Sequence, residues 1–369
     1  MDRDDCLVKI LLISGIYPPD DGGPAKFVPQ FANHLISQGH KVKVITLTDS
    51  KRSKNEFPYP VRFINRSLTK PLRMILTTKY IFLSSIRSDL IFANGLYEET
   101  GVAVRFSRTP TLGKIVGDPV WERARNSGST KLTIESFNNV ESGGFQRKLL
   151  RFALNGFSEI ITPSQQLADF VKQWGVSKAV SMIPNGVQVI GMTNQPKGFD
   201  LVTASRLVPW KNVDLLIRIA AKKNLKLCVI GDGPENLKLR TLATELNAQV
   251  TFTGALAQDK VSQQVAKAKY FALLSTYEGM SFALLEALGA GIPAIVSNAA
   301  GNVAVIQNGV NGYVVDISNE ISCGNLIAEI LSSSSDYQKV SEGALQSVIK
   351  NYSIDRTLAN TETKLLSLK

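Results

Sequence analysis

Two glutamates flank the start of an expected helix in YEGMSFALLEALGAGIPAIVSN, residues 277–298. Glu278 follows a strand-like apolar run, and Glu286 is expected about two turns into the helix. A helix N-terminus offers unpaired N–H groups and a positive dipole end, which together favour a diphosphate. Glu286 would then accept hydrogen bonds from ribose hydroxyls, and Glu278 would meet the hydroxyls of a sugar. Gly279, Met280 and Ser281 are expected to open this helix, and together with Phe282 they are expected to bind the ligand that carries the diphosphate.

Two further segments could bind the same ligand. In SRLVPWKN, residues 205–212, Arg206 ends a strand-like run and Lys211 precedes a predicted helix. Cations there suit the β-phosphate of a nucleotide leaving group, where they replace Mg²⁺ electrostatically. In PPDDGGPAKF, residues 18–27, Gly22 and Gly23 let the backbone approach a ligand closely. Each segment alone is also consistent with a capped helix, a solvated loop or a tight turn.

Positioning these residues requires strands that end at a common edge. Apolar runs alternate with amphipathic stretches and then restart after residue 198, which predicts an α/β fold with two doubly wound, Rossmann-like domains. Ligands bind beyond the carboxyl ends of such strands, so the two domains are expected to face each other across a cleft. The predicted strands lie at 8–15, 41–47, 89–95, 111–117, 159–164, 199–207, 225–233, 249–256, 270–276 and 292–298.

The domain boundary is predicted in a seam rich in Pro, Gly and Asn, residues 183–199. Residues 1–188 form the expected N-terminal domain, and residues 189–350 form the expected C-terminal domain. Residues 351–369 are expected to form a helix that crosses back to the N-terminal domain.

Composition excludes several other classes of protein. The 369 residues are 44% hydrophobic and 20% charged, as in a soluble globular protein. Cys6, Cys228 and Cys323 are scattered, and His34 and His40 are the only histidines, so neither a disulfide framework nor a zinc site is expected. The acidic start lacks the features of a signal peptide, and no run reaches the length of a membrane span. We therefore expect a cytoplasmic protein.

Charge is uneven along the chain. Residues 1–190 hold 25 Lys and Arg against 16 Asp and Glu, and residues 191–369 hold 17 against 15. The net charges of +9 and +2 suggest an anionic partner for the first half. No recognition helix, zinc knuckle or RNA-binding aromatic pattern is present, so no nucleic acid is expected.

The basic and apolar stretch 62–89 is predicted to form helices, one of which has a cationic face. This pattern is consistent with helices that pack against the rest of the protein. It is also consistent with helices that contact an anionic surface, which would be the inner face of the plasma membrane. The cations of this stretch are Arg62, Arg66, Lys70, Arg73, Lys79 and Arg87.

The order and spacing of the motifs resemble the family-4 glycosyltransferases, which have the GT-B fold, over nearly the whole chain. Glu278 and Glu286 match the family's paired glutamates, Arg206 and Lys211 its cation pair, and Gly22 and Gly23 its glycine loop. The segments IPNGV (183–187) and FTGAL (252–256) also fit, and the resemblance implies that backbone near Leu256 contacts the donor base. VGDPVWERARNSG (116–128) resembles a bacterial subgroup of cell-surface polysaccharide assembly.

Two positions depart from the family pattern. Many members carry a histidine near the transferred sugar, and the corresponding loop here offers Asp118 instead, which makes Asp118 a candidate catalytic residue. Ala304 stands where the family usually has a glutamate.

The resemblance implies a retaining, metal-independent hexosyltransferase. No second carboxylate is paired as in a retaining hydrolase, so front-face substitution is inferred. The only Asp-x-Asp pair, Asp2 and Asp4, precedes the first strand. The resemblance implies a UDP- or GDP-sugar as donor, with UDP favoured, bound by residues 189–350, while residues 1–188 bind the acceptor. No other cofactor is expected. The acceptor would be a saccharide or a polyprenyl-diphosphate-linked saccharide.

Three other functions are compatible with parts of this pattern. A dinucleotide-dependent oxidoreductase would need G-x-G-x-x-G after the first strand, and neither SGIYPPDDGGPAKF nor GDGPEN (231–236) supplies it. A nucleotide-sugar epimerase of the same architecture, or a non-catalytic partner subunit that binds nucleotide sugar, remains open.

Overall fold

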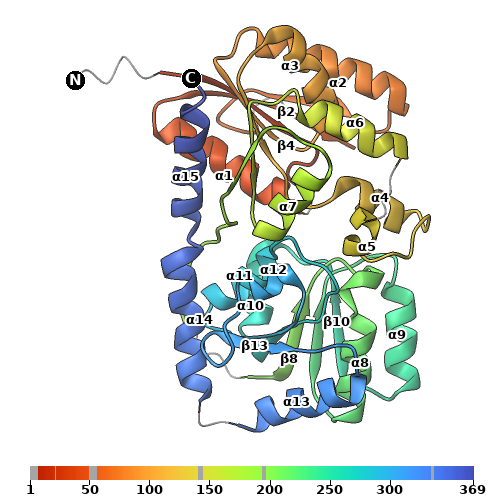
Figure 1. Cartoon of the computed structure of the whole chain (residues 1–369). Coiled ribbons are helices and arrows are strands. Elements are labelled where there is room, and N and C mark those ends of the chain that lie inside the picture. Colours follow the sequence, from red (N-terminus) through yellow and green to blue (C-terminus); the bar gives the residue numbers. More distant parts are fainter. Residues whose placement is uncertain (1–6, 21, 50–55, 140–143, 193–196, 334–335) are drawn as a thin grey trace. The chain divides into compact units, whose positions relative to one another are not determined.

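The computed structural model describes residues 7–20, 22–49, 56–139, 144–192, 197–333 and 336–369. The chain divides into two compact units (Figure 1). The N-terminal unit contains residues up to Pro184 together with Thr357–Lys369, and the C-terminal unit contains Asn185–Arg356. Asp2, Asp4, Cys6 and Asp21, together with positions 193–196 of the expected seam, lie outside the described residues.

The N-terminal unit is built on a seven-stranded sheet with strand order β3-β2-β1-β4-β5-β6-β7, in which all pairs are parallel. Its two central strands, β1 and β4, are almost wholly buried, as their continuous apolar runs predict. The strands are β1 Lys9–Ser14, β2 Lys41–Thr48, β3 Val61–Asn65, β4 Leu90–Asn94, β5 Thr111–Lys114, β6 Glu159–Thr162 and β7 Ala179–Met182.

Helices connect these strands as crossovers, because parallel neighbours cannot be joined by a tight turn. They are α1 Gly23–Ser37, α2 Lys70–Ser85, α3 Tyr97–Ser107, α4 Pro119–Asn126, α5 Ile134–Asn139, α6 Gly144–Leu154 and α7 Gln165–Gln173.

One sequence prediction in this unit was wrong in part. The stretch 62–89 was expected to form helices, and α2 lies within it, but residues 61–65 form β3, which pairs with β2 from Val44 and Val61 onward. As an edge strand, β3 is buried fully only at Ile64, and Arg62 and Asn65 interrupt its apolar residues, so it lacks the continuous apolar run that marked the other strands.

The C-terminal unit repeats the arrangement with six parallel strands, in the order β10-β9-β8-β11-β12-β13. Two apolar clusters pack on its sheet, one including Val202 and Leu284 and the other including Leu201 and Leu216. Alternate residues of β8 thus serve opposite faces. The strands are β8 Phe199–Ala204, β9 Leu227–Ile230, β10 Val250–Gly254, β11 Ala268–Leu273, β12 Ala294–Ser297 and β13 Gly312–Val315.

The helices of this unit follow their strands in the same way. They are α8 Val213–Lys222, α9 Asn236–Glu245, α10 Gln258–Val265, α11 Phe282–Gly289, α12 Ala300–Val303, α13 Glu320–Ser332 and α14 Tyr337–Asn351. Both sheets have the Rossmann strand order, so the predicted α/β class with two doubly wound domains is confirmed.

The last helix, α15 Ile354–Leu366, is held by the N-terminal unit from Thr357 onward. Thr357 Oγ1 donates to the carbonyl of Pro184 at 3.1 Å. The carboxylate of Glu362 meets Nε2 of His34 at 2.8 Å and Nε2 of His40 at 3.2 Å. Both histidines therefore hold α15 against the N-terminal unit, His34 from within α1 and His40 from the turn after it.

Candidate active site

The cations Arg206 and Lys211 lie on the loop that leaves the carboxyl end of β8. Arg206 is exposed two residues after the strand, and Lys211 ends a 3₁₀ turn, Pro209–Lys211. The loop is anchored on both sides: Leu207 N donates to Asp232 O, and Thr276 N donates to Trp210 O, each at 2.9 Å. These anchors come from the loops after β9 and β11, which neighbour β8.

Two glycines after β9 allow this close packing. A Cβ on Gly231, where φ is +125°, would lie 2.0 Å from Ser205 O, and one on Gly233 would lie 2.4 Å from Leu207 O. Any side chain there would displace the loop that carries Arg206. This role of Gly231 and Gly233 was not predicted from the sequence, although glycines directly after a strand were the available signal.

Lys211 and Glu278 form an ion pair. Lys211 Nζ lies 2.5 Å from Glu278 Oε1, and the side chains are 16% and 8% exposed. Ser275 Oγ donates to the same oxygen at 2.6 Å. The structure thus joins a residue expected at the phosphate to one expected at the sugar. Sequence reasoning did not predict this pair or the support from Ser275.

The segment after Glu278 is fixed by residues from distant parts of the chain. Asn185, 1% exposed, donates from Nδ2 to Met280 O at 3.1 Å. A Cβ on Gly301 would lie 2.0 Å from Glu278 O, so α12 packs directly on this backbone. The IPNGV segment therefore contributes Asn185 as a clamp on the loop that leads into α11.

Helix α11 begins later than expected. Ser281 is its N-cap and accepts from Leu284 N at 3.3 Å, so Phe282 is the first helical residue. Glu286 consequently lies just over one turn into the helix, and the expected two turns were wrong. The half-buried Glu286 side chain lines a narrow hollow with Ala204 of β8 and residues of α10.

These residues gather where ligands bind in a doubly wound sheet. Strands β8 and β11 are adjacent, and the chain order reverses between them. Arg206 and Lys211 follow β8, and Glu278 follows β11, so all three flank the switch point at the carboxyl edge. Leu256 follows β10 at the same edge and packs half-buried against the apolar core.

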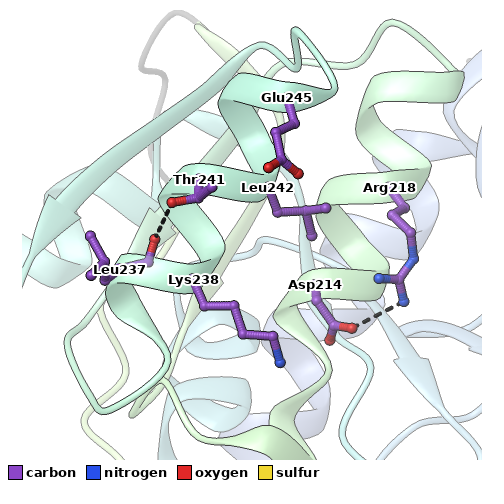
Figure 2. Close-up of a pocket in the computed structure, with 7 residues that line it drawn as sticks. All are labelled: Asp214, Arg218, Leu237, Lys238, Thr241, Leu242 and Glu245. Carbon is purple, nitrogen blue, oxygen red and sulfur yellow. Dashed lines mark hydrogen bonds and ion pairs between the residues drawn. The ribbon is translucent and has the colours of Figure 1, made fainter.

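Figure 2 shows a different hollow of the C-terminal unit, of about 470 Å³. It lies between α8 and α9, and an ion pair of 3.0 Å between Asp214 and Arg218 forms part of one wall. None of the residues predicted to bind the donor lines this hollow.

In the N-terminal unit, Gly22 and Gly23 lie beyond β1 at the start of α1. Gly22 has a φ of +143°, and a Cβ there would lie 2.6 Å from Ile16 Cδ1. Strand β1 neighbours β2 and β4, so this glycine pair also lies at a switch point.

Buried polar side chains lie at the same edge of this sheet. The register pairs Ser14 of β1 with Asn94 of β4, and the pairing of β4 with β5 brings Lys114 next. Within the described residues, the amide of Asn94 and the ammonium of Lys114 have no hydrogen-bond partner. Lys114 Nζ lies 3.7 Å from the ring centroid of Phe27. Burial lowers the pKa of Lys114 to about 7.

Asp118 is a fully buried N-cap of α4 in this unit. Oδ1 accepts from Val120 N at 3.0 Å and Trp121 N at 3.1 Å. Oδ2 accepts from Arg147 at 2.6 Å and Asn138 at 3.3 Å. Both oxygens are thus engaged in holding α4, α5 and α6 together, which favours a structural role. A catalytic role for Asp118 stays a prediction.

Over the described ranges, no three His, Cys, Asp or Glu side chains gather into a metal-binding group. The free thiols of Cys228 and Cys323 are buried, and burial raises the pKa of each to about 11. A search of the described residues finds no helix that is long and apolar enough to span a membrane.

Two family models match consecutive parts of the chain. Glycosyltransferase Family 4 matches residues 21–189, and Glycosyl transferases group 1 matches residues 193–347. The chain is 24% identical to the GDP-mannose-dependent alpha-(1-6)-phosphatidylinositol monomannoside mannosyltransferase of Mycobacterium tuberculosis, over 88% of this chain and 89% of that protein. It is 25% identical to the phosphatidylinositol N-acetylglucosaminyltransferase gpi3 subunit of Schizosaccharomyces pombe, over 80% and 67%.

Solved structures show the same fold. Anabaena HepE in complex with UDP and glucose aligns with a TM-score of 0.79 at 20% identity, covering 98% of this chain and all of that chain. Sucrose-phosphate synthase from Thermosynechococcus elongatus aligns with a TM-score of 0.81 at 17% identity, covering 98% and 99%. The family matches, the relatives along most of the chain and this shared architecture show that the chain belongs to the family-4 glycosyltransferases, with the GT-B fold.

Proposed function

We propose that the chain is a retaining, metal-independent hexosyltransferase whose donor, a UDP- or GDP-sugar, binds at the carboxyl edge of the C-terminal sheet. The observation that carries the proposal is the group formed by Arg206, Lys211 and Glu278 at the β8–β11 switch point. Two cations beside a carboxylate offer complementary partners for a diphosphate and a sugar.

The cations stabilise the departing diphosphate. An ammonium has three N–H donors, so Lys211 can contact Glu278 and a phosphate oxygen at once. Arg206 is exposed on the same loop and supplies a second, bidentate cation. These fixed charges meet the negative charge that develops on the leaving group, which is the role a metal ion has elsewhere.

The remaining groups bind the rest of the donor. Both contacts of Glu278 described above fall on Oε1, which leaves Oε2 as the proposed acceptor for a sugar hydroxyl. Glu286 accepts from the ribose, and backbone near Leu256 contacts the base. The backbone of Gly279–Phe282 supports the phosphates at the start of α11.

Transfer then proceeds on one face of the sugar. The acceptor oxygen bonds to the anomeric carbon on the side from which the diphosphate leaves, and the acceptor proton passes to the released phosphate. The N-terminal unit contributes the acceptor side, where Gly22 and Gly23 permit close approach. We propose a saccharide or lipid-linked saccharide as acceptor in surface glycan assembly at an anionic membrane. Relatives that act on phosphatidylinositol-linked substrates support a lipid-linked acceptor.

A donor panel followed by nuclear magnetic resonance tests the proposal. UDP-, GDP- and ADP-sugars are screened by thermal shift, because a bound donor raises the melting temperature. The protein is then incubated with the donor that binds and with a saccharide acceptor, or with water as acceptor where no saccharide reacts. The anomeric proton signal of the first product shows whether the configuration of the transferred sugar is retained. Retention supports the proposal and inversion contradicts it. An epimerised nucleotide sugar would indicate an epimerase, and binding without turnover would indicate a non-catalytic subunit.

A further inference from the structure

On helix α2 large apolar side chains face outward, whereas a helix at a water-exposed surface turns its apolar side chains inward. The buried side chains of α2 are Thr77, Ile81, Ser84 and Ser85. Its outer face instead carries large apolar side chains spaced three or eight residues apart, which places them on one stripe. Their exposed fractions are 46% for Leu72, 66% for Ile75, 39% for Leu83 and 54% for Ile86, at the C-cap.

Two neighbouring helices extend this apolar surface. Helix α3 packs against α2, and α6 packs against α3; Figure 1 shows the three together in the N-terminal unit. Phe106 of α3 is 75% exposed, and Phe145 of α6 is 78% exposed. We call this surface, formed by the outer sides of the three helices, the α2–α3–α6 face.

The exposed charges within α2, α3 and α6 are all positive, and Asp89 is exposed beyond α2, two residues after Arg87. Helices α2 and α6 contain no Asp or Glu, and the two glutamates of α3, Glu98 and Glu99, are buried. The exposed cations of these helices and their ends are Lys70, Lys79, Arg87, Arg105, Arg108, Lys148 and Arg151. Cations beside exposed apolar side chains are typical of helices that lie in a membrane interface.

A groove in the face adds room for an apolar chain. It has a volume of about 610 Å³ and runs between α2 and α3, lined mainly by Met74, Ile75, Phe82, Val102 and Phe106. Lys79 lies at the same groove, where its long stem can cover apolar surface while its ammonium reaches a headgroup.

The structure also changes which cations are available. Arg66 forms ion pairs with Asp20 and Asp49. Arg73 donates to the carbonyl of Arg66 at 2.8 Å. Arg62, on the edge strand β3, lies over the ring of Tyr80. These three cations of the basic stretch have partners within the unit, as does Arg105 of α3, which donates to the carbonyl of Phe152 at 2.5 Å and lies over its ring. Lys70, Lys79 and Arg87 are joined by Arg108, Lys148 and Arg151.

We propose that the α2–α3–α6 face docks onto an anionic lipid bilayer, with its apolar side chains in the interfacial layer and its cations against the headgroups. This proposal names the surface that would contact the membrane invoked in the proposed function. It rests on the proposed function only for the lipid-linked nature of the acceptor. Each cation near an anionic surface adds about 1 kcal/mol, which is about a fivefold change in partitioning.

Vesicle co-sedimentation of the full chain tests the docking. Vesicles of phosphatidylcholine with and without phosphatidylglycerol are compared at low and high salt. We expect binding to the anionic vesicles that weakens with salt. In the variant Lys70→Gln/Lys79→Gln, vesicle binding should fall about fivefold per cation. The charge-matched control is Lys131→Gln/Lys172→Gln, whose lysines are exposed elsewhere in the same unit. Its loss of binding free energy should be less than half that of the test variant.

Apolar variants separate insertion from simple attraction. Ile75→Ser/Phe106→Ser should lower binding about tenfold or more, because each removes a large apolar side chain from the interface. The control Leu237→Ser/Ile321→Ser removes side chains that are 79% and 68% exposed on the C-terminal unit and should bind like the wild type. Circular dichroism and thermal shift with UDP and GDP check that each variant is folded and still binds nucleotide.

Three results would overturn the docking proposal. They are equal binding to neutral and anionic vesicles, equal loss in the test and control variants, and a dimer in light scattering that Ile75→Ser/Phe106→Ser converts to a monomer. The dimer would show that a second copy covers the face. If instead no nucleotide sugar binds while vesicle binding behaves as expected, the proposed function fails and the docking stands.

Discussion

Lys211→Met tests the ion pair that the structure places at the centre of the site. The substitution keeps the length of the side chain but leaves the carboxylate of Glu278, 8% exposed, without its cation. Removing one partner of a buried pair costs about 3–5 kcal/mol. We take the lower value, about 3 kcal/mol, because Lys211 itself keeps 16% exposure and the pair is therefore partly solvated.

The expected loss is large enough to measure by calorimetry. For a domain the size of the C-terminal unit, about 3 kcal/mol corresponds to a fall in melting temperature of about 6–12 °C. Lys222→Met is the control, because its pair with Glu320 is 60% and 25% exposed and should contribute less than about 1 kcal/mol.

The double variant Lys211→Met/Glu278→Gln separates stability from chemistry. It replaces the ion pair by neutral groups of similar size and should recover most of the lost stability. Turnover should not recover, because both charges act on the donor. Losses in stability that simply add, with no coupling between the two sites, would refute the ion pair. Recovery of turnover along with stability would refute the catalytic roles.

Four other predictions follow from the site and the fold. Arg206→Ala should lower kcat about 10²- to 10³-fold, and near-normal turnover would remove Arg206 from the phosphate site. Glu286→Ala should weaken donor binding by about 1.5–3 kcal/mol with a smaller effect on kcat; titration calorimetry and steady-state kinetics would show the reverse if the roles are exchanged. EDTA should leave activity intact, and restoration by Mg²⁺ or Mn²⁺ after chelation would contradict metal independence. Lys114→Met should stabilise the chain below pH 7, because burial lowers the folded-state pKa of Lys114 to about 7. Above pH 7 the folded state releases this proton before the unfolded state does, so the wild type gains stability as the pH rises. The difference in free energy of unfolding between variant and wild type should therefore shrink toward pH 10. Urea unfolding at a series of pH values that shows a constant difference would refute this.

The sequence predicted the features that depend on local pattern. Continuous apolar runs marked the buried strands, and Glu278, Arg206 and Gly22 were placed at strand ends because loops follow such runs. The edge strand β3 was missed, because a half-exposed strand with Arg62 and Asn65 carries no apolar run. The start of α11 was misplaced because the Ser281 cap was not recognised.

Contacts between distant segments could not be predicted in the same way. Lys211 reaches Glu278 only because β8 and β11 are neighbours in the sheet, an order that local pattern does not encode. Asn185 clamps Met280 across 95 residues for the same reason. The outward apolar stripe of α2 could not be predicted. Periodicity shows that a helix has an apolar face and a polar face, but it does not show which of the two is buried.

A crystal structure of the chain with UDP, or with the nucleotide that gives the largest thermal shift, tests the central claim most directly. Our account predicts the diphosphate within hydrogen-bond distance of Arg206 and Lys211, and the ribose hydroxyls at Glu286. A nucleotide bound elsewhere, for example in the hollow between α8 and α9, or a diphosphate that contacts neither cation, would contradict it.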